Sequence, residues 1–377
     1  MSEEFQTATH PNQFALEKSM RTLVETGGPS PLMQAVQMLR LWFGRPSFSP
    51  KEYFLYRMYQ PEDFKRVKST FVSYSENTEL CRSLSRPEAR ERYIDVFQNK
   101  LTFEDRMAEI GVPTVRTKAV FGPCDGDRHH RLASRADIED FLRDASNYPF
   151  FGKPTGSSHS LGVLSFDALL DDGETIRLAT GHEVALTKVA AHIADTWHAG
   201  YLFQDREKNH ESLRRFMGDA IGCARIVTIL GLDGPEILYA LQKIPAKGMI
   251  HDNSTSTAKG AVCPISKDGV LGRISGFQTY GATDSDYWQD TKTPVTGTVL
   301  PNWEKVVEIC RAAHASMPGM GMVGFDVMHT DRGPILGEMN GNPFFSLLQG
   351  SIQVGGKSPE FLARYEIARR MSGAARA

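Results

Sequence analysis

The chain lacks the features that define membrane and disulfide-stabilised proteins. It has no run of about 18 apolar residues, the length that would predict a membrane-spanning helix. An odd number of scattered cysteines without a Cys-x-x-Cys pair predicts reduced thiols instead of a disulfide framework. The N-terminus is polar and acidic and has no signal-peptide pattern, so we expect a cytoplasmic protein. The cysteines are Cys81, Cys124, Cys223, Cys263 and Cys310.

A large net charge is also missing. The net charge is −2 over 377 residues, so no basic field favours nucleic acid as a partner. The eleven histidines include no His-Glu-x-x-His motif, and the pair His129-His130 lies in a charged stretch, where a solvated pair is the simpler interpretation. With 41% hydrophobic residues the chain can build a core, and its length suits two or three packed lobes. Neither charge nor composition indicates an oligomeric state.

Hydrophobic periodicity predicts a mixture of helices and strands. Strands are expected at 112–120, 201–205, 224–229 and 236–242. Helices are expected at 31–43, 98–110, 134–145, 181–198, 301–317 and 359–370. A polar loop at 246–261 is longer than most structureless connections, which favours a functional segment.

The stretch from Gly324 to Asn340 is predicted to form two antiparallel strands with a tight turn between them. Asp331-Arg332-Gly333 fits a three-residue loop, with Gly333 at the position that needs a left-handed backbone. Such a loop sets Thr330 opposite Pro334 and fixes the register of the whole hairpin.

That register brings three oxygen-bearing side chains to one face. Asp326 falls directly opposite Glu338, and Asn340 shares the face of Glu338 because strand side chains alternate. Two facing carboxylates repel each other, and a hard cation such as Mg²⁺ removes that cost. Asp326, Glu338 and Asn340 are therefore the candidate metal ligands. The alternative is an ordinary acidic surface hairpin, and a four-residue loop would separate Asp326 from Glu338.

A second element is a strand that ends at Lys153 and leads into a loop rich in glycine and serine. Gly156 and Gly162 allow a close backbone approach to a ligand, and the loop amides can form an anion-binding concavity. Lys153 would present a point charge to phosphate. The order differs from a P-loop, since the lysine precedes the glycines and a strand follows. Hydroxyl donors are added by Ser157, Ser158 and Ser160.

These two elements together resemble the ATP-grasp enzymes, and the chain is most similar to their sugar-transfer-associated branch. The resemblance covers most of the chain. The branch is indicated by Phe48–Tyr59 and Pro301-Asn-Trp303. The remaining matching segments are Asn99-Lys100, Phe151-Gly-Lys153, Phe203–Arg206 with His210, Ala224–Thr228, Asp326 and Gly337–Pro343.

The resemblance implies an α+β fold in which two α+β lobes clasp ATP, preceded by a mainly helical N-terminal extension. We expect the extension at 1–97, the first lobe with Lys153 and its loop at 98–200, and the second lobe with the hairpin at 201–377. It also implies ATP and Mg²⁺, with two ions, as cofactors.

Individual roles follow from the resemblance. Lys100, which on sequence alone is a solvated helix charge, would contact nucleotide phosphate. Gln204 and Asp205 would meet adenine and ribose, although many relatives carry Glu where this chain has Gln204. His210 matches a family histidine, with a plain surface position as an equal alternative. The candidate nucleotide-binding set is Lys100, Lys153, Gly156, Ser157, Ser158, Ser160, Gln204, Asp205 and His210.

Arg225 lies among apolar residues in a predicted strand. A buried arginine is costly unless it is paired, so it should meet an anion, here a terminal or acyl phosphate. Arg225 and Lys153 are the candidate catalytic residues. We expect an ATP- and Mg²⁺-dependent carboxylate–amine ligase that forms an amide bond through an acyl phosphate, in small-molecule or cell-surface biosynthesis. The alternatives are a kinase that acts on a hydroxyl and a non-catalytic binding protein.

Overall fold

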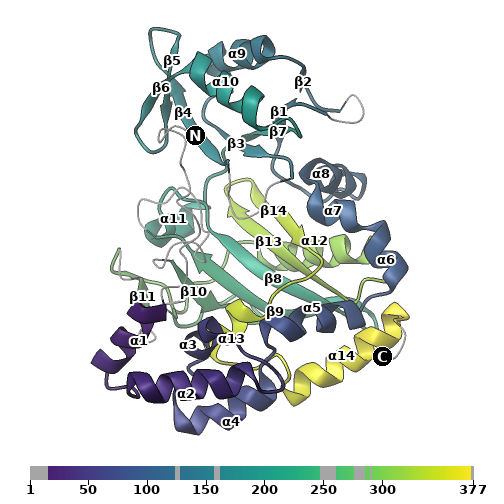
Figure 1. The fold of residues 1–377 in the computed structure, drawn as a ribbon. Coiled ribbons are helices and arrows are strands. Elements are labelled where there is room, and N and C mark those ends of the chain that lie inside the picture. Colours follow the sequence, from purple (N-terminus) through teal and green to yellow (C-terminus); the bar gives the residue numbers. More distant parts are fainter. Residues whose placement is uncertain are drawn as a thin grey trace.

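Two separate β-sheets dominate the computed structural model, which describes residues 16–123, 128–156, 162–246, 260–275, 285–288 and 291–374. One sheet has seven strands and the other has five, with helices packed around both (Figure 1). This architecture confirms the predicted α+β class.

The seven-stranded sheet has the strand order β2-β1-β7-β3-β4-β5-β6. Its strands are β1 (Thr117–Phe121), β2 (Arg131–Leu132), β3 (Phe150–Pro154), β4 (Leu164–Leu169), β5 (Thr175–Leu178), β6 (Glu183–Ala185) and β7 (Tyr201–Asp205). Helices α9 (Arg135–Arg143) and α10 (Leu186–Thr196) pack on it through a common apolar core. At the centre of this core, the rings of Phe150 and Phe166 stack with centroids 4.4 Å apart.

The five-stranded sheet has the strand order β10-β9-β8-β13-β14. Its strands are β8 (Cys223–Gly231), β9 (Gly234–Ile244), β10 (Ala261–Pro264), β13 (Met322–Thr330) and β14 (Gly333–Asn340). A separate two-stranded ribbon consists of β11 (Tyr287–Trp288) and β12 (Thr293–Pro294). Helix α12 (Trp303–Ala315) packs on one face of this five-stranded sheet, and alternate residues of β13, such as Phe325 and Val327, join its core.

The opposite face of that sheet is covered by the first five N-terminal helices together with α13 (Ser346–Ile352) and α14 (Pro359–Ser372), whereas Ala89 and Val96 of the last two N-terminal helices join the core of α12. Pro61 and Pro87 each occupy the first turn of a helix, where the missing N–H costs nothing. The N-terminal helices are α1 (Leu16–Glu25), α2 (Pro31–Trp42), α3 (Pro50–Leu55), α4 (Pro61–Thr70), α5 (Tyr74–Ser83), α6 (Pro87–Arg92) and α7 (Ile94–Gln98).

The predicted elements differ from the observed ones mainly at their ends. The strand expected at 112–120 is shorter, since β1 spans Thr117–Phe121. The helix expected at 181–198 is divided into β6 and α10. Most of the polar loop expected at 246–261 lies outside the described residues. No helix in the described ranges combines the length and the apolar character needed to cross a bilayer.

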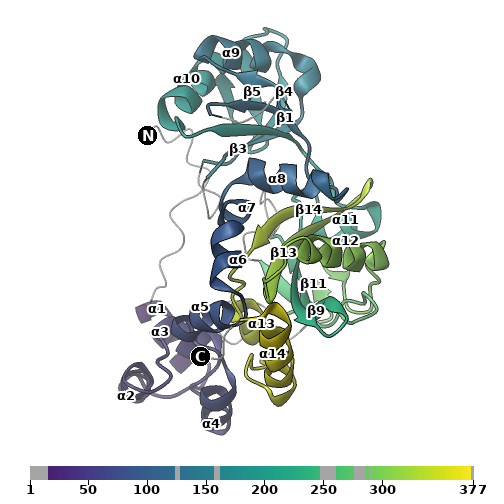
Figure 2. The same ribbon diagram turned by 90° about the vertical axis from the view of Figure 1, so that its right-hand side faces the viewer.

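The chain enters and leaves the seven-stranded sheet through two segments that both contact the β13–β14 hairpin. Helix α8 (Lys100–Glu109) lies at the junction (Figure 2) and is followed by residues 110–116, which lead to β1. Here the Leu336 amide donates to the carbonyl of Pro113 at 2.9 Å. Beyond β7, the chain returns through residues 206–222, where the His210 amide donates to the carbonyl of His329 at 2.8 Å.

Strand β7 crosses the boundary expected between the lobes. It follows residue 200, yet it pairs with β1 and β3 in the middle of the first sheet. The first sheet therefore extends to Asp205, five residues into the range expected for the second lobe.

Candidate functional site

The β13–β14 hairpin differs from the predicted one in its turn. Thr330 pairs with Gly333, not with Pro334, so Asp331 and Arg332 form a two-residue turn where three residues were expected. Gly333 has a φ of 103°, as expected for a glycine in a left-handed position.

A β-bulge restores the predicted pairing further along. The register shifts by one residue between Asp326 and Val327, and Gly337 is the extra residue on the facing strand. Asp326 therefore pairs with Glu338, as the sequence predicted, and Asn340 pairs with Gly324. The bulge compensates for the shorter turn.

Asp326 lies between two cations. Arg225 on β8 donates from Nε to Asp326 Oδ1 at 2.5 Å and from Nη2 to Oδ2 at 3.1 Å. Lys243 on β9 donates to Oδ2 at 3.2 Å, and its side chain is only 9% exposed. Burial alone would raise the pKa of Asp326, but Arg225 and Lys243 hold that pKa well below its usual range. Arg225 thus meets an anion, as expected of a buried arginine, and the anion is a protein carboxylate.

Two lysines near the hairpin come from outside the five-stranded sheet. Lys100 lies on α8 and Lys153 lies on β3 of the seven-stranded sheet. The Nζ of Lys100, at the start of α8, lies 3.4 Å from the carbonyl oxygen of Thr155. Burial and the charge of Lys153 lower the pKa of Lys100 to about 8, and the carboxylate of Glu338 opposes this shift. Burial also lowers the pKa of Lys153, while Glu104 and Glu338 raise it. Glu338 therefore lies within electrostatic reach of both lysines.

Gln204 is held by a cluster that the sequence did not reveal. Its Nε2 donates to Glu104 Oε1 and, at 3.0 Å, to the hydroxyl of Thr117, while Thr117 donates to Glu104 Oε2 at 2.6 Å. Burial raises the pKa of Glu104 to about 7, although the hydrogen bond from Thr117 and the charge of Lys153 lower it. Gln204, on the strand expected to meet adenine, is 2% exposed and is fixed from the neighbouring helix.

Asp205 and His210 lie further along the same segment. Asp205 forms an ion pair with Lys118 at 3.2 Å and is partly exposed. His210 is the N-cap of α11 (Glu211–Met217), and its ring nitrogen accepts a hydrogen bond from the Ser212 amide. The structure therefore gives His210 a role as a helix cap beside the hairpin turn.

The two loop glycines have different local surroundings. A Cβ on Gly156 would have no atom within 4 Å among the described residues. A Cβ on Gly162 would overlap the Trp197 ring, and Gly162 also has a φ of 72°. Packing thus accounts for Gly162, whereas Gly156 leaves room for a ligand. The predicted donors Ser157, Ser158 and Ser160 lie outside the described residues.

This contrast predicts different outcomes for two alanine substitutions. Gly156→Ala should leave the melting temperature unchanged and weaken binding of a non-hydrolysable ATP analogue about tenfold, because the added methyl occupies ligand space. Gly162→Ala should lower the melting temperature through the Trp197 clash and backbone strain. Calorimetric titration and thermal melting measure the two effects. Unchanged affinity in a folded Gly156→Ala protein would contradict the role of this glycine.

The hairpin's donor set suits Mg²⁺ that is shared with a nucleotide. Two carboxylates and an amide offer the oxygen ligands that this ion prefers, and Mg²⁺ commonly combines one or two protein carboxylates with substrate phosphates. Within the described ranges, no group of three His, Cys, Asp or Glu side chains could hold a metal by itself. The Nδ2 of Asn340 is buried and has no hydrogen-bond partner among the described residues, and the Oδ1 of the same amide is the atom that would ligate a cation.

Sequence reasoning missed Lys243 and Glu104. Lys243 is a single cation in the apolar strand Tyr239–Ile244, the same pattern that singled out Arg225. Glu104 follows Lys100 by one helical turn, so the face of α8 that carries the lysine also carries the glutamate. Lys243 therefore joins Arg225, Lys100 and Lys153 as a cation near the hairpin carboxylates, and Glu104 joins Asp326 and Glu338 as a carboxylate there.

Comparison with known families identifies the family of the chain. A family model described as sugar-transfer associated ATP-grasp matches residues 79–355. Because this match covers more than half of the chain, the protein belongs to the sugar-transfer associated ATP-grasp family, which confirms the resemblance stated from the sequence.

Solved structures of synthases, synthetases and ligases resemble the chain distantly. D-alanyl-alanine synthetase A from Vibrio cholerae is 12% identical, with a TM-score of 0.43 over 77% of this chain and 68% of that one. The D-alanine–D-alanine ligase from Helicobacter pylori is 12% identical, with a TM-score of 0.39 over 73% and 61%. N5-carboxyaminoimidazole synthase from Aspergillus clavatus is 11% identical, with a TM-score of 0.35 over 68% and 47%, so this chain spans about half of its length. The search of curated proteins found no match.

Proposed function

We propose that the protein is an ATP- and Mg²⁺-dependent ligase that joins a carboxylate to an amine through an acyl phosphate. The observation that carries this proposal is the pairing of Asp326 with Glu338 beside Arg225, with Lys243 on Asp326 and two further lysines in electrostatic reach of Glu338. A site with this excess of positive charge favours a polyphosphate. Family membership supports ATP as that ligand.

The residues divide into three roles. Lys100 and Lys153 would bind the phosphates of the nucleotide, and Gln204, fixed by Glu104, would meet the base edge together with Asp205 near the ribose. Glu338, Asp326 and Asn340 would hold Mg²⁺, which when bound neutralises the phosphate charge as the γ-phosphoryl group moves.

The reaction has two steps. A carboxylate oxygen of the first substrate attacks the γ-phosphorus and expels ADP, which leaves an acyl phosphate. An amine then attacks the acyl carbon and expels inorganic phosphate, which takes the proton that the amine loses, so that the amide forms. Arg225 and Lys243 would stabilise the negative charge that builds up in both steps. The two lobes would exclude the water that otherwise hydrolyses the acyl phosphate.

A hydroxyl kinase is the second candidate, because the same nucleotide site would serve it. The two reactions differ in the fate of one oxygen atom. In the ligase, oxygen-18 in the substrate carboxylate appears in the released inorganic phosphate, and hydroxylamine traps the acyl phosphate as a hydroxamate. A kinase gives a stable phosphate ester and no labelled phosphate, and an adenylating enzyme puts the label in AMP. Label in AMP, or a phosphate ester, would contradict the ligase proposal.

Nucleotide binding should weaken as the pH rises. Lys100 has a pKa of about 8 in the folded protein, so its positive charge is present at lower pH and is lost as the pH passes through that value. Affinity for a non-hydrolysable ATP analogue should therefore fall above that pH, by up to about tenfold per pH unit for one linked proton. Calorimetric titration across this range measures the effect.

Lys100→Arg is the matched variant, because arginine remains charged throughout. Glu104, whose pKa is about 7, is present in both proteins, so their difference isolates Lys100. An equal decline in the wild type and in Lys100→Arg would show that Lys100 does not contact the phosphates.

A further inference from the structure

Helix α2 presents large apolar side chains to the outside of the molecule. Leu32 is 76% exposed, Leu39 is 57% exposed and Phe43 is 80% exposed. Met33 and Trp42 are each just over half exposed. Single exposed apolar side chains are ordinary, but a contiguous group of them marks an interaction surface. We call these five side chains the α2 stripe.

Helical spacing brings the members of the α2 stripe together. Leu32, Leu39 and Phe43 are seven and four residues apart, so they share one face of a helix with 3.6 residues per turn. Phe43 is the C-cap residue of α2 and keeps helical backbone angles. The buried residues of α2 lie on the opposite face, and they are Gln34, Met38 and Leu41.

The inner face of α2 fixes the outward direction of the stripe. Gln34 Nε2 donates to the carbonyls of Pro29 at 2.8 Å and Met20 at 3.2 Å. Met38 and Leu41 belong to the apolar core that covers the five-stranded sheet. Figures 1 and 2 show α2 at the end of the molecule that lies away from the seven-stranded sheet.

The charges in this part of the sequence are almost all positive. Between Glu25 and Glu62 the only carboxylate is Glu52, which is 1% exposed and accepts hydrogen bonds from the amides of Ser49 and Tyr74. The same interval contains four cations. They are Arg40, Arg45, Lys51 and Arg57.

Three cations lie at the C-terminal end of the stripe. Arg40 in the last turn of α2 and Arg45 just beyond it are both exposed. Lys68 on α4 comes close as well, because its Nζ is 3.6 Å from the position of a Cβ on Gly44. The apolar stripe therefore ends in a cationic surface, which would attract anions.

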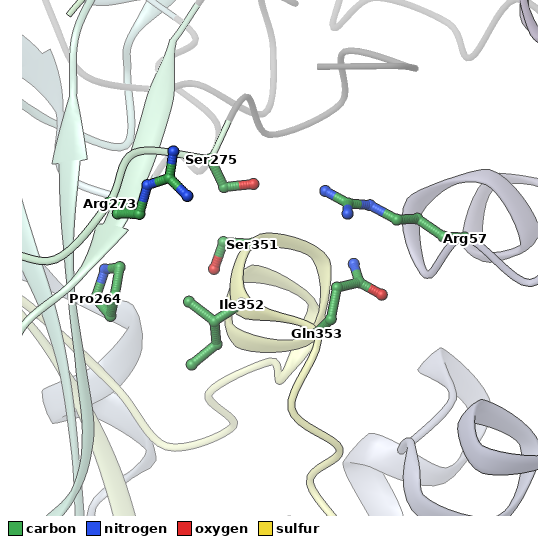
Figure 3. Close-up of a pocket in the computed structure, with 7 residues that line it drawn as sticks. All are labelled: Arg57, Pro264, Arg273, Ser275, Ser351, Ile352 and Gln353. Carbon is green, nitrogen blue, oxygen red and sulfur yellow. The ribbon is translucent and has the colours of Figure 1, made fainter. Parts of the chain in front are cut away.

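The pocket in Figure 3 is a different kind of surface. Arg57, which follows α3, and Arg273 line this cavity of about 290 Å³, and no residue of the α2 stripe does. The stripe lies on a single helix and forms an outward ridge. Such a ridge can enter a fluid lipid layer, which adapts to its shape.

A second copy of the chain fits the α2 stripe less well than a lipid surface does. The helix has 12 residues and is about 18 Å long, whereas a stable interface covers about 800 Å² on each partner. Two copies packed through this ridge would also bring their arginines together. Helices that lie on a bilayer surface combine Leu, Phe and Trp with nearby Lys and Arg, as α2 and its surroundings do.

We propose that the α2 stripe docks the protein on the surface of a bilayer that contains anionic lipid. The apolar side chains of the stripe enter the boundary between headgroups and acyl chains, and the three cations at its end face the lipid phosphates. The helix lies along the surface and does not cross the bilayer. Docking does not depend on the proposed ligase reaction, because the stripe shares no residue with the nucleotide site.

The experiment mixes the full chain with vesicles of phosphatidylcholine alone or of phosphatidylcholine with phosphatidylglycerol, and flotation measures the bound fraction. Binding should be tighter to the anionic vesicles and should weaken as salt is added. Trp42 is the most exposed of the four tryptophans, so its emission should move to shorter wavelength on binding and be quenched by brominated lipid. Trp42→Phe should keep the binding and lose the shift in emission.

Variants of exposed residues test the stripe without opening the core. Leu39→Ser and Phe43→Ser should each weaken binding about tenfold or more, because each removes apolar surface from the lipid. Arg40→Gln should weaken binding to the anionic vesicles about fivefold. Leu232→Ser, in the exposed turn between β8 and β9, and Arg311→Gln, on α12, are the matched controls and should have no effect. Thermal melting should be unchanged in all five variants.

Four results would overturn the proposal. The first is that the chain binds neither kind of vesicle, and the second is that Leu39→Ser and Phe43→Ser bind like the wild type. The third is equal binding to both kinds of vesicle, which would remove the role of the cations. The fourth is a dimer that sedimentation detects without vesicles and that both serine variants dissociate, which would assign the stripe to a second copy of the chain.

Discussion

Glu338→Gln should reduce ADP production at least a hundredfold while the protein keeps its melting temperature. Glu338 is exposed on β14, so its replacement removes a charge without opening the core. The loss of activity follows because one of the two hairpin carboxylates that face each other no longer binds Mg²⁺ as an anion. Steady-state assays across a Mg²⁺ titration, together with thermal melting, test both parts. Near-normal ADP production at saturating Mg²⁺ would show that the hairpin is not the metal site.

Asp326→Asn should be compared with Glu338→Gln, because the two variants are expected to differ in stability. It should abolish activity as well, but it should also destabilise the fold by about 3–5 kcal/mol, because it leaves Arg225 and Lys243 buried without their anion. Denaturant unfolding of the two variants side by side separates the catalytic effect from the structural one. Equal stability in both variants would contradict the assignment of Asp326 as the anion that pairs with these two cations.

Lys153→Ala should weaken binding of the ATP analogue, or slow phosphoryl transfer, by one to several orders of magnitude. The substitution removes a cation from the position where β3 meets the glycine-rich loop. Burial lowers the pKa of Lys153, so its charge is unfavourable in the folded protein and its removal should leave the melting temperature unchanged or higher. Titration calorimetry and single-turnover kinetics measure the two effects on function.

Arg177→Ala is a suitable control for Lys153→Ala. Arg177 lies on β5 of the same sheet, where it forms an exposed ion pair with Glu183. If both variants bind and turn over ATP like the wild type, Lys153 takes no part in nucleotide binding or phosphoryl transfer.

The sequence predicted the pairing in the hairpin correctly although two of its details were wrong. Counting from a three-residue loop gave Asp326 opposite Glu338. The real turn has two residues, and the bulge at Gly337 shifts the register back by one. Neither detail can be read from the sequence alone, because Asp-Arg-Gly is compatible with both turns and a glycine within a strand does not specify a bulge.

The partner of a side chain was predictable only where burial of a charge requires a partner of opposite charge. Arg225 was expected to meet an anion because a buried guanidinium needs one, and the same reasoning applied to Lys243 would have found it. Gln204 was correctly predicted to lie on a strand, but its partner Glu104 comes from a different element. The tertiary arrangement that brings α8 beside β7 decides this contact, and no local pattern encodes it.

The hairpin has a mechanical consequence for the two sheets. The chain segments that lead into and out of the seven-stranded sheet are both hydrogen-bonded to the hairpin, one through Pro113 and Leu336 and the other through His210 and His329. A hinge rotation of one sheet relative to the other would stretch or bend these hydrogen bonds. The same rotation would therefore act on β13 and β14, the strands that carry Asp326 and Glu338. The amide protons of His210 and Leu336 would therefore report such a rotation. Their rates of exchange with deuterium should change when the ATP analogue binds.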